Sequence, residues 1–298
     1  MTTIVPPASE APAISATLAT TSTSAVRRSE VLRNLLRSPT FLIGSTVLLF
    51  WVFDAIFWRL IAPYDPQQPF ANTLEAPTGA HLLGTDDLGR DVLSRLLAGA
   101  STVLAVAPAA TIIGLIGGIT LGLFTGYYRG VLDDVAMRIV DAVLAFPLVI
   151  LAVLVLTLLG SSEFDVIVLI GVTFTPLVGR TVRSAVLGQR DLEYVAAARL
   201  AGESGLRIMF REILPNIAGP IIVEGTVRLG YAIFTSATLS FLTLGIQQPS
   251  PDWGLTISLG QQYLQVAPWI VLFPAVALAT LVVAINIAAD GLAKALNS

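Results

Sequence analysis

Few side chains in this sequence are of a type that does chemistry, and several of them lie in one segment. His81 is the only histidine, and Asp86, Asp87 and Asp91 follow it within ten residues. Imidazole and carboxylate groups are common metal ligands. The same acids also cap helices and close tight turns beside glycines. We favour the second interpretation, in which Asp86 or Asp87 caps a short helix that runs to Leu97, and we expect no metal here.

The composition excludes most other chemistry. The chain has no cysteine, which rules out thiolate catalysis and cysteine-based metal sites. Lys294 is the only lysine, so no GxxxxGK[ST] phosphate loop can form. No serine is paired with the single histidine, and no basic surface supports binding to nucleic acid. We therefore expect that this chain is not an enzyme and that it binds no cofactor itself.

A second group of charges falls within or near apolar segments. Glu224 and Arg228 are four residues apart with the acid first, which is the favourable order for an ion pair within a helix. Arg138 and Asp141 are three apart, whereas Asp54 has no evident partner. Charged side chains in a bilayer rarely face lipid. The favoured interpretation is that these pairs neutralise each other; the alternative is that Glu224, Arg228 and Asp141 line a pore or gate.

The third group of charges is a polar segment between two long apolar stretches, residues 193–215. Its apolar residues recur at helical spacing on both sides of Gly202, which can take the left-handed conformation that ends one helix. Two short amphipathic helices of this kind often seat in a groove of a partner protein. Their predicted apolar ridges are Val195, Ala198 and Leu200 before the glycine, and Leu206, Met209, Phe210 and Ile213 after it.

The elements that position these residues are membrane helices. Of the 298 residues, 55% are apolar and only 12% are charged, against about 25% charged in a typical soluble domain. A helix needs about 20 apolar residues to cross the hydrocarbon layer. Six stretches qualify, and they predict an all-α membrane protein with a membrane domain over residues 40–298. The six spans are 40–61, 98–126, 135–160, 165–187, 217–246 and 266–290.

The distribution of basic residues predicts the orientation of these spans. With both termini in the cytoplasm, ten arginines and lysines lie inside and two, Arg90 and Arg95, lie outside. The cytoplasmic parts are then an N-terminal tail (1–39), whose first 26 residues we expect to be disordered, and the loop 188–216. The outer loops are 62–97 and 247–265. In the second of these, Pro251 and Trp253 predict a rigid turn anchored at the membrane interface.

The second predicted span carries a stripe of small residues. Glycines recur every four residues along it, which places them on one face of the helix and lets another helix backbone approach closely. We expect helix packing rather than a wall of a solute path, with the partner helix left open. The stripe consists of Gly114, Gly118, Gly122 and Gly126.

Three segments together resemble one family. Residues 193–215 are similar to the coupling motif of bacterial ABC-importer permeases, written as EAA, three residues, a glycine, a spacer and I-x-L-P. Ala196 stands where the family commonly has glutamate, so Glu193 or Arg199 is the candidate for a substitute contact. Residues 81–91 and 239–254 are similar to hallmarks of the C-type subunits of dipeptide, oligopeptide and nickel permeases. The matching coupling residues are Ala197, Ala198, Gly202, Ile213, Leu214 and Pro215.

The resemblance implies a type I ABC importer fold in the bacterial cytoplasmic (inner) membrane. It implies as partners a B-type permease subunit, two cytosolic ATPase subunits or domains that hold ATP and Mg, and an extracytoplasmic substrate-binding protein, besides membrane lipid. The implied coupling residues are Glu193, Ala196, Ala197, Ala198, Arg199, Gly202, Arg207, Phe210, Ile213 and Pro215, and the implied outer-loop residues are His81, Asp86, Asp87, Arg90, Asp91, Pro251 and Trp253.

The implied function is ATP-driven import of dipeptides or oligopeptides. Import of nickel or another non-peptide solute by the same family is the nearest alternative. A secondary transporter that works without ATP is a more distant one, because such proteins commonly show internal repeats or an ion site at the midplane, and neither is evident here.

Overall fold

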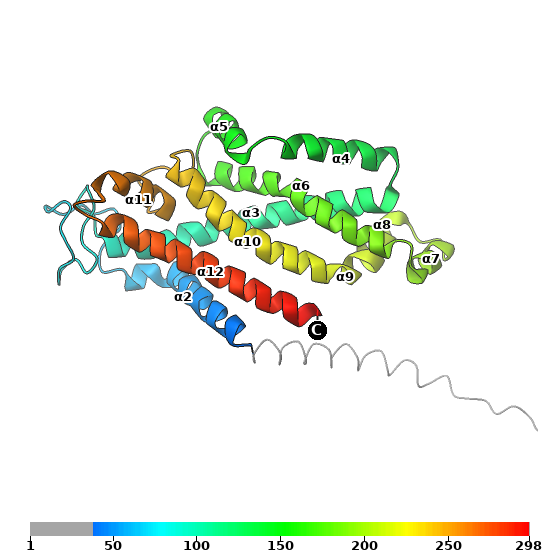
Figure 1. Cartoon of the computed structure of the whole chain (residues 1–298), viewed down its shortest axis with the longest axis horizontal. Coiled ribbons are helices and arrows are strands. Elements are labelled where there is room, and N and C mark those ends of the chain that lie inside the picture. The colour runs from blue at the N-terminus through cyan, green and yellow to red at the C-terminus, as the bar shows by residue number, and fades with distance from the viewer. Residues whose placement is uncertain (1–37, 298) are drawn as a thin grey trace, which may run out of the picture.

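The structure, a computed structural model, describes residues 38–297 as a bundle of long helices (Figure 1). The predicted disorder of residues 1–26 and nearly all of the tail 1–39 lie outside the described residues. Between residues 38 and 297 there is no β-strand, only isolated bridges. The helices are α2 (Pro39–Ile61), α3 (Val92–Tyr128), α4 (Val131–Leu144), α5 (Leu148–Leu159), α6 (Glu163–Gln189), α7 (Glu193–Leu200), α8 (Gly205–Arg207), η1 (Ile208–Ile213), α9 (Leu214–Asn216), α10 (Ala218–Phe241), α11 (Trp253–Gly260), η2 (Gln261–Tyr263) and α12 (Trp269–Asn297).

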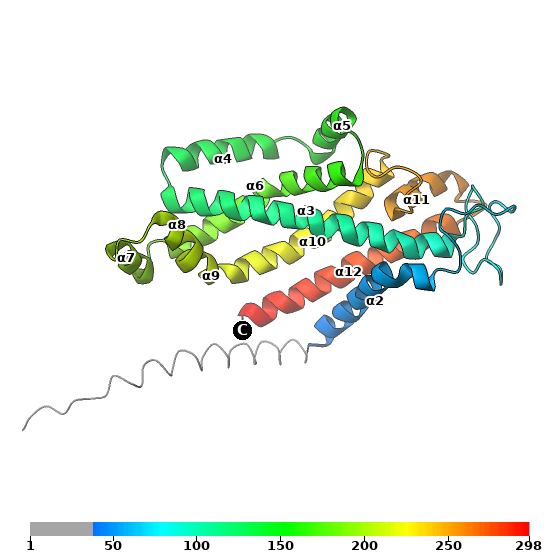
Figure 2. The ribbon, with the colours of Figure 1, turned by 180° about the vertical axis from the view of Figure 1, so that it is seen from behind.

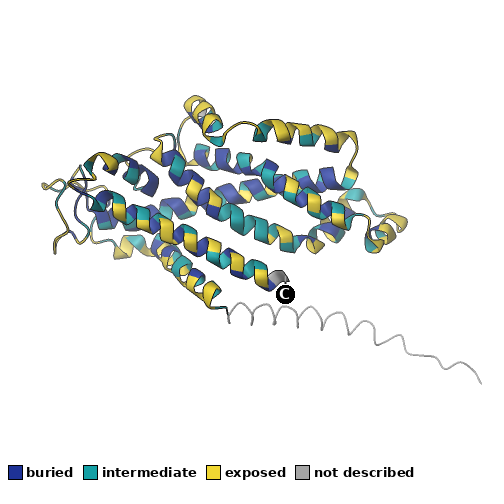
Figure 3. Cartoon of the chain, viewed as in Figure 1, coloured by how far each residue is buried: buried dark blue, intermediate teal, exposed yellow. Residues whose placement is uncertain are grey.

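The long helices define two ends of the bundle. One end carries α7 and the turn that follows it, and is called the α7 end below. The other carries α11 and the loop between α2 and α3, and is called the α11 end (Figures 1 and 2). Helices α2 and α12 lie along one edge of the bundle and α4 with α5 along the opposite edge in both views. Buried residues concentrate on α3 and α6 between these edges, and on α11 (Figure 3).

The centre of the bundle is the contact between α3 and α6, and the glycine stripe makes this contact. A side-chain carbon on Gly122 would lie 2.6 Å from Cβ of Val182 and 2.7 Å from the backbone of Arg183 and of Gly179. Gly114, one end of the stripe, lies in the same way against Phe174. The partner helix of the stripe is therefore α6 of the same chain.

The start of α3 differs from the prediction. The helix begins at Val92 and continues for 37 residues without a break, so residues 92–97 belong to the long helix rather than to a separate short one. Its N-cap is Asp91, whose side chain accepts a hydrogen bond from the backbone N–H of Ser94. The predicted cap by Asp86 or Asp87 is wrong, because Asp86 instead closes the turn before it.

Four helices of the described chain are long and apolar enough to cross a membrane alone, and the count rises to six if each of two bent pairs is one span. The first bent pair corrects the predicted span 135–160. It consists of α4 and α5, which meet at 87°. Pro147 is the N-cap of α5, so the proline separates two helices where the sequence predicts one span. The second pair joins residues 205–216 to α10 at 71°.

Candidate functional site

The loop between α6 and α10 folds as the sequence predicts at its turn. Helix α7 ends at a glycine, Gly202, with a φ of 77°. The N–H of Gly202 donates to the carbonyl of Arg199, and the N–H of Glu203 donates to the carbonyl of Ala198. This pair of bonds is the Schellman motif, which satisfies the last carbonyls of a helix and reverses the chain. The turn is therefore fixed by backbone geometry.

The apolar ridges predicted for this loop divide into two sets. Val195, Met209 and Ile213 are buried against α3 and α6, so they attach the loop to its own bundle and cannot seat in a partner. Leu200 is 91% exposed, and three further large apolar side chains are also exposed. Ala198 of the predicted ridges is half-buried, and Leu192, which is not among them, is exposed. The exposed set is named the coupling face here; it consists of Leu192, Leu200, Leu206 and Phe210.

Two arginines attach α7 to the end of α3. Arg190 donates from Nη1 to the carbonyl of Tyr127 at 2.7 Å. Arg199 lies over the Tyr127 ring, with its Cζ 5.2 Å from the ring centroid, and donates to the carbonyl of Arg190. The guanidinium of Arg199 is thus directed to its own chain. Glu193 and Ala196 are exposed, and Glu193 remains the candidate for a contact with a partner.

Beyond the turn, Ile208–Ile213 form a π-helical segment, which the sequence analysis missed. Such segments occur often at functional sites. Within this region Phe210 is exposed while Ile208 and Ile213 are buried, and Arg207 pairs with Glu203 at 3.5 Å. Pro215 lies in α9, immediately before the bend into α10. Composition gave no signal for the wider helix.

A belt of charge crosses α4, α6 and α10 within the helical bundle. Asp141 on α4 pairs with Arg180 on α6. The next residue on α6, Thr181, donates to Glu224 on α10 at 3.3 Å, and Glu224 accepts from Arg228 at 2.6 Å. The predicted pair Glu224–Arg228 is present. The predicted pairing of Asp141 with Arg138 is wrong, because the neighbouring helix offers Arg180.

A second link between α4 and α6 lies closer to the α7 end. Arg183 donates from Nε and Nη2 to the two carboxylate oxygens of Asp133, each at 2.6 Å. Bidentate pairs of this type fix orientation as well as adding energy. Asp54 on α2 is buried, and its two carboxylate oxygens have no hydrogen-bond partner among the described residues. The sequence shows no evident partner for Asp54, and the described structure supplies none.

At the α11 end, the His81 segment is a compact network of internal bonds. Nδ1 of His81 lies 3.0 Å from Oδ1 of Asp91, whose Oδ2 accepts from Ser94. Asp86 accepts from the backbone N–H and from Nε of Arg90, at 2.8 and 2.7 Å. Among residues 38–297, no group of three or more histidines and acids is placed to hold a metal ion. The acids close the turn and cap α3.

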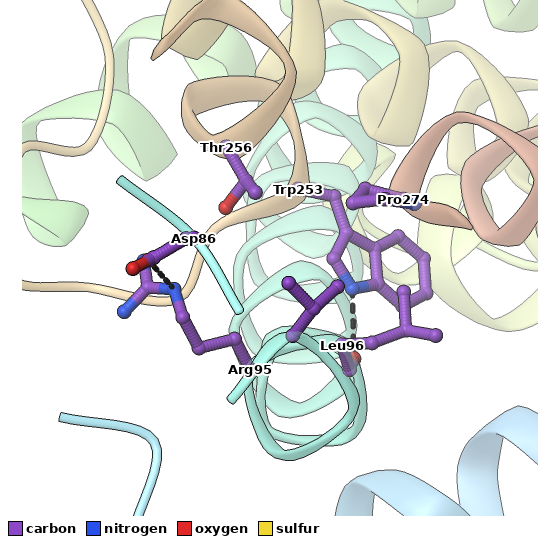
Figure 4. Close-up of a pocket in the computed structure, with 7 residues that line it drawn as sticks. Asp86, Arg95, Leu96, Trp253, Thr256 and Pro274 are labelled. Atoms are coloured by element: carbon purple, nitrogen blue, oxygen red, sulfur yellow. Dashed lines mark hydrogen bonds and ion pairs between the residues drawn. The ribbon is translucent and has the colours of Figure 1, made fainter. Parts of the chain in front are cut away.

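Trp253 corrects another prediction. Its side chain is fully buried and donates from Nε1 to the carbonyl of Leu96 at 2.9 Å (Figure 4). The ring packs on Trp51 and lies directly over Gly99, where a side chain would overlap it. Trp253 therefore joins α11 to the helical core and does not anchor a turn at the membrane interface. Pro251 lies against the same glycine.

Arg95 is a residue that the sequence analysis did not single out. It is buried on α3, beside Asp86 (Figure 4). Its Nη1 donates to the carbonyl of Pro66 and its Nη2 to the carbonyl of Ser250, each at 3.2 Å. One side chain thus joins the α2–α3 loop to the segment before α11. Arg90 of the loop and Arg95 at the start of α3 are both used internally.

Asp252 is the buried N-cap of α11, and its carboxylate accepts a hydrogen bond from the backbone N–H of Leu255. This residue predicts a pH dependence of the stability of the protein. Burial raises the pKa of Asp252 to about 6, against about 3.9 in an unfolded chain. The folded state therefore binds the proton more tightly, and this stabilisation is complete below about pH 4 and is lost as the pH rises through 6. We expect D252N, which keeps a cap acceptor, to flatten the fall in thermal stability of the purified complex between pH 5 and 7.5. The difference over this pH range should be on the order of 1 kcal/mol; equal slopes for both proteins would contradict it.

Comparisons with known proteins agree on one family. Residues 118–298 match the family described as binding-protein-dependent transport system inner membrane component. Residues 27–77 match the N-terminal transmembrane domain of oligopeptide transport permease C. The dipeptide transport system permease protein DppC of Alkalihalophilus pseudofirmus is 39% identical over 270 residues, which cover 90% of this chain and 88% of that protein.

Further similarities extend this result. The glutathione transport system permease protein GsiD of Pectobacterium atrosepticum is 37% identical, with 90% of both chains covered. Among solved structures, a chain of the MetNI methionine ABC transporter in an inward-facing conformation superposes with a TM-score of 0.57 at 21% identity, covering 68% of this chain and 96% of that one. The helical fold, the loop at the α7 end and these matches agree. The chain belongs to the binding-protein-dependent transport family of inner-membrane components, the permease subunits of ABC importers, which have no ATPase site of their own.

Proposed function

We propose that this chain is the C-type transmembrane subunit of an ATP-driven importer of dipeptides or oligopeptides. The observation that carries the proposal is the coupling face, four exposed large apolar side chains on a loop whose other large apolar residues pack into the bundle. A soluble loop has no need of such a surface, whereas a groove on a partner protein would cover it. The relatives named for dipeptide and glutathione transport support the choice of peptides.

The proposed topology has six spans, with both termini in the cytoplasm. The spans are the four long helices, the bent pair α4–α5, and α10, while residues 205–216 stay in the cytoplasmic loop with the coupling face. Support comes from the arginines of the α7 end, such as Arg129, Arg190 and Arg211, which the positive-inside rule places in the cytoplasm. The exposed charges of the α2–α3 loop are acidic, because Arg90 is buried, as is Arg95 at the start of α3. The α11 end then faces outward.

The proposed complex contains four kinds of subunit. A B-type permease completes the pore, two cytosolic ATPase subunits bind ATP and Mg, and an extracytoplasmic binding protein delivers the peptide at the α11 end. In this scheme the coupling face seats in the ATPase, and the contacts of Arg190 and Arg199 with Tyr127 transmit its displacement to α3. Of the belt residues, Asp141 lies along the pore, whereas Glu224 and Arg228 join α10 to α6.

The test is reconstitution of the complete complex in nanodiscs with its native partners. We expect ATPases to co-purify with the chain and a peptide-loaded binding protein to raise the rate of ATP hydrolysis, whereas the empty binding protein raises it less. Stimulation by a binding protein loaded with nickel, and not with peptide, would move the function to the alternative solute. A chain that purifies alone and transports without ATP would contradict the importer assignment.

A further inference from the structure

The belt of charge contains one ion pair that differs from the others in its exposure. The side chains of Asp141 and Arg180 are 61% and 50% exposed. The neighbouring acids Asp133 and Glu224 are largely buried, each against its own arginine. The two buried pairs have the character of structural links. The Asp141–Arg180 pair joins the same helices but leaves most of its charged surface uncovered by this chain.

The position of this pair along the two helices favours water or protein, rather than lipid, as its neighbour. Arg180 lies nine residues before the end of α6, which is about 14 Å along the helix axis. Helix α6 is apolar and long enough to cross a membrane, and Asp141 belongs to the bent pair α4–α5 that passes the same test. Charged groups at such depth face water or protein. The exposed faces of α4 and α6 at this level therefore line an aqueous space or a contact with another chain.

The chemistry of the pair favours an aqueous space with a zwitterionic solute. Arg180 has five N–H donors and Asp141 four lone-pair sites, and the described contacts use few of them. A peptide with free termini carries one carboxylate and one ammonium group. Its carboxylate can replace Asp141 as the partner of Arg180, and its ammonium group can replace Arg180 as the partner of Asp141. The net charge of the site then stays at zero and neither charge is left unpaired, which limits the cost of opening the ion pair.

We propose that Arg180 and Asp141 lie on the solute path and bind, respectively, the carboxylate and the ammonium group of the transported peptide. This inference rests on the proposed function, because it takes the solute to be a peptide. The Asp133–Arg183 pair, which is bidentate and mostly buried, keeps α4 on α6 while the exposed pair opens. The Asp141–Arg180 ion pair can therefore open to bind the peptide without separation of α4 from α6.

The first experiment measures uptake into proteoliposomes by the complete complex. A dipeptide with free termini is compared with its C-terminal amide, in wild type and in R180Q. The measured quantity is the ratio of dipeptide uptake to amide uptake, and this ratio is compared between wild type and R180Q. The binding protein has its own preference for a free carboxylate, but that preference is the same for both permeases and cancels in the comparison. We expect R180Q to reduce the discrimination against the amide about fivefold, the value of roughly 1 kcal/mol for an exposed charge contact. D141N should do the same for an N-acetylated dipeptide.

The matched control is R129Q. Arg129 forms an ion pair with Asp191 that is as exposed as the Asp141–Arg180 pair, but it lies beyond the end of α3. R129Q should leave both ratios unchanged. R180K should restore discrimination if R180Q has lost it, because the charge is kept. Unchanged ratios in R180Q and D141N, or an equal change in R129Q, would overturn the proposal.

A second measurement tests the aqueous surface without any peptide, and it uses the absence of cysteine from the sequence. Val172 is exposed on α6, on the other side of the helix centre from Arg180 along the chain, and Ile56 is exposed on α2, at the edge of the bundle opposite α4. In the assembled complex, V172C should react with a charged, membrane-impermeant thiol reagent and I56C should not. Protection of V172C overturns the placement of this face on the path.

The outcomes also separate this proposal from the proposed function. If the wild-type complex hydrolyses ATP but imports no peptide, the proposed function fails and the assignment of peptide termini fails with it. If peptide uptake is normal and the ratios do not respond to R180Q or D141N, the importer assignment stands and only the terminus site is overturned.

Discussion

A leucine at position 122 should abolish recovery of the assembled chain. Gly122 is where α3 and α6 come closest to backbone contact, and a side chain there meets Cβ of Val182 as well as the backbone of Arg183 and Gly179. A flexible side chain can move aside, but two helix backbones cannot do so without parting. Overpacking of a core costs about 1–3 kcal/mol where repacking is possible, and we expect more for G122L. The measurement is the yield and thermal stability of the complex by size-exclusion chromatography in detergent.

The matched control for this variant is G188L. Gly188 is a helical glycine of α6 with no atom in the way of a side chain. A leucine there tests the same change of residue in the same helix pair without the clash. Wild-type-like yield of G188L beside loss of G122L identifies the helix contact as the cause. A stable G122L complex would show that α3 and α6 separate easily, and the fold described above would not hold.

The second large effect is expected from L200D, which places a charge at the most exposed apolar position of the coupling face. Leu200 touches little of its own chain, so the substitution should leave folding and assembly with the partner permease intact. In a partner's groove it exchanges a buried leucine, worth about 1.5–3 kcal/mol, for a desolvated carboxylate. We expect peptide uptake and peptide-stimulated ATP hydrolysis to fall at least about tenfold.

L200M is the companion variant, because methionine keeps apolar bulk at similar volume. It should retain most of the uptake. The co-purification of ATPase subunits with L200D shows at which step the loss occurs. Uptake by L200D at the wild-type level would contradict the assignment of the coupling face, whatever the state of the other three residues.

Local geometry explains what could be predicted from the sequence. The glycine stripe at four-residue spacing can only be one face of a helix, and Gly202 between two amphipathic segments is typical of a helix end. Glu224 and Arg228 are neighbours on any helix. Each of these depends on residues within one turn of one another. The membrane class follows from composition alone, because a charged fraction this low cannot cover a soluble surface.

Contacts between distant segments could not be predicted in the same way. Asp141 has an arginine three residues away, and only the packing of α4 beside α6 shows that Arg180 is its partner. Trp253 is as compatible with a membrane interface as with a core, and its place depends on the space above Gly99. The break at Pro147 turns α5 by 87°, whereas proline in membrane helices often produces only a kink.

The unbroken length of α3 has a geometrical consequence. Its 37 residues form a rigid rod of about 55 Å. At one end Arg95 fastens two loops to it, and at the other end Tyr127 receives the contacts of Arg190 and Arg199. A rod held in this way converts rotation into displacement: a tilt of about 5° pivoting at one end carries the other by about 5 Å. The two ends of the permease are therefore connected rigidly through α3. A small tilt of α3 that starts at the α7 end displaces its other end, at the α11 end, by more than the width of an atom.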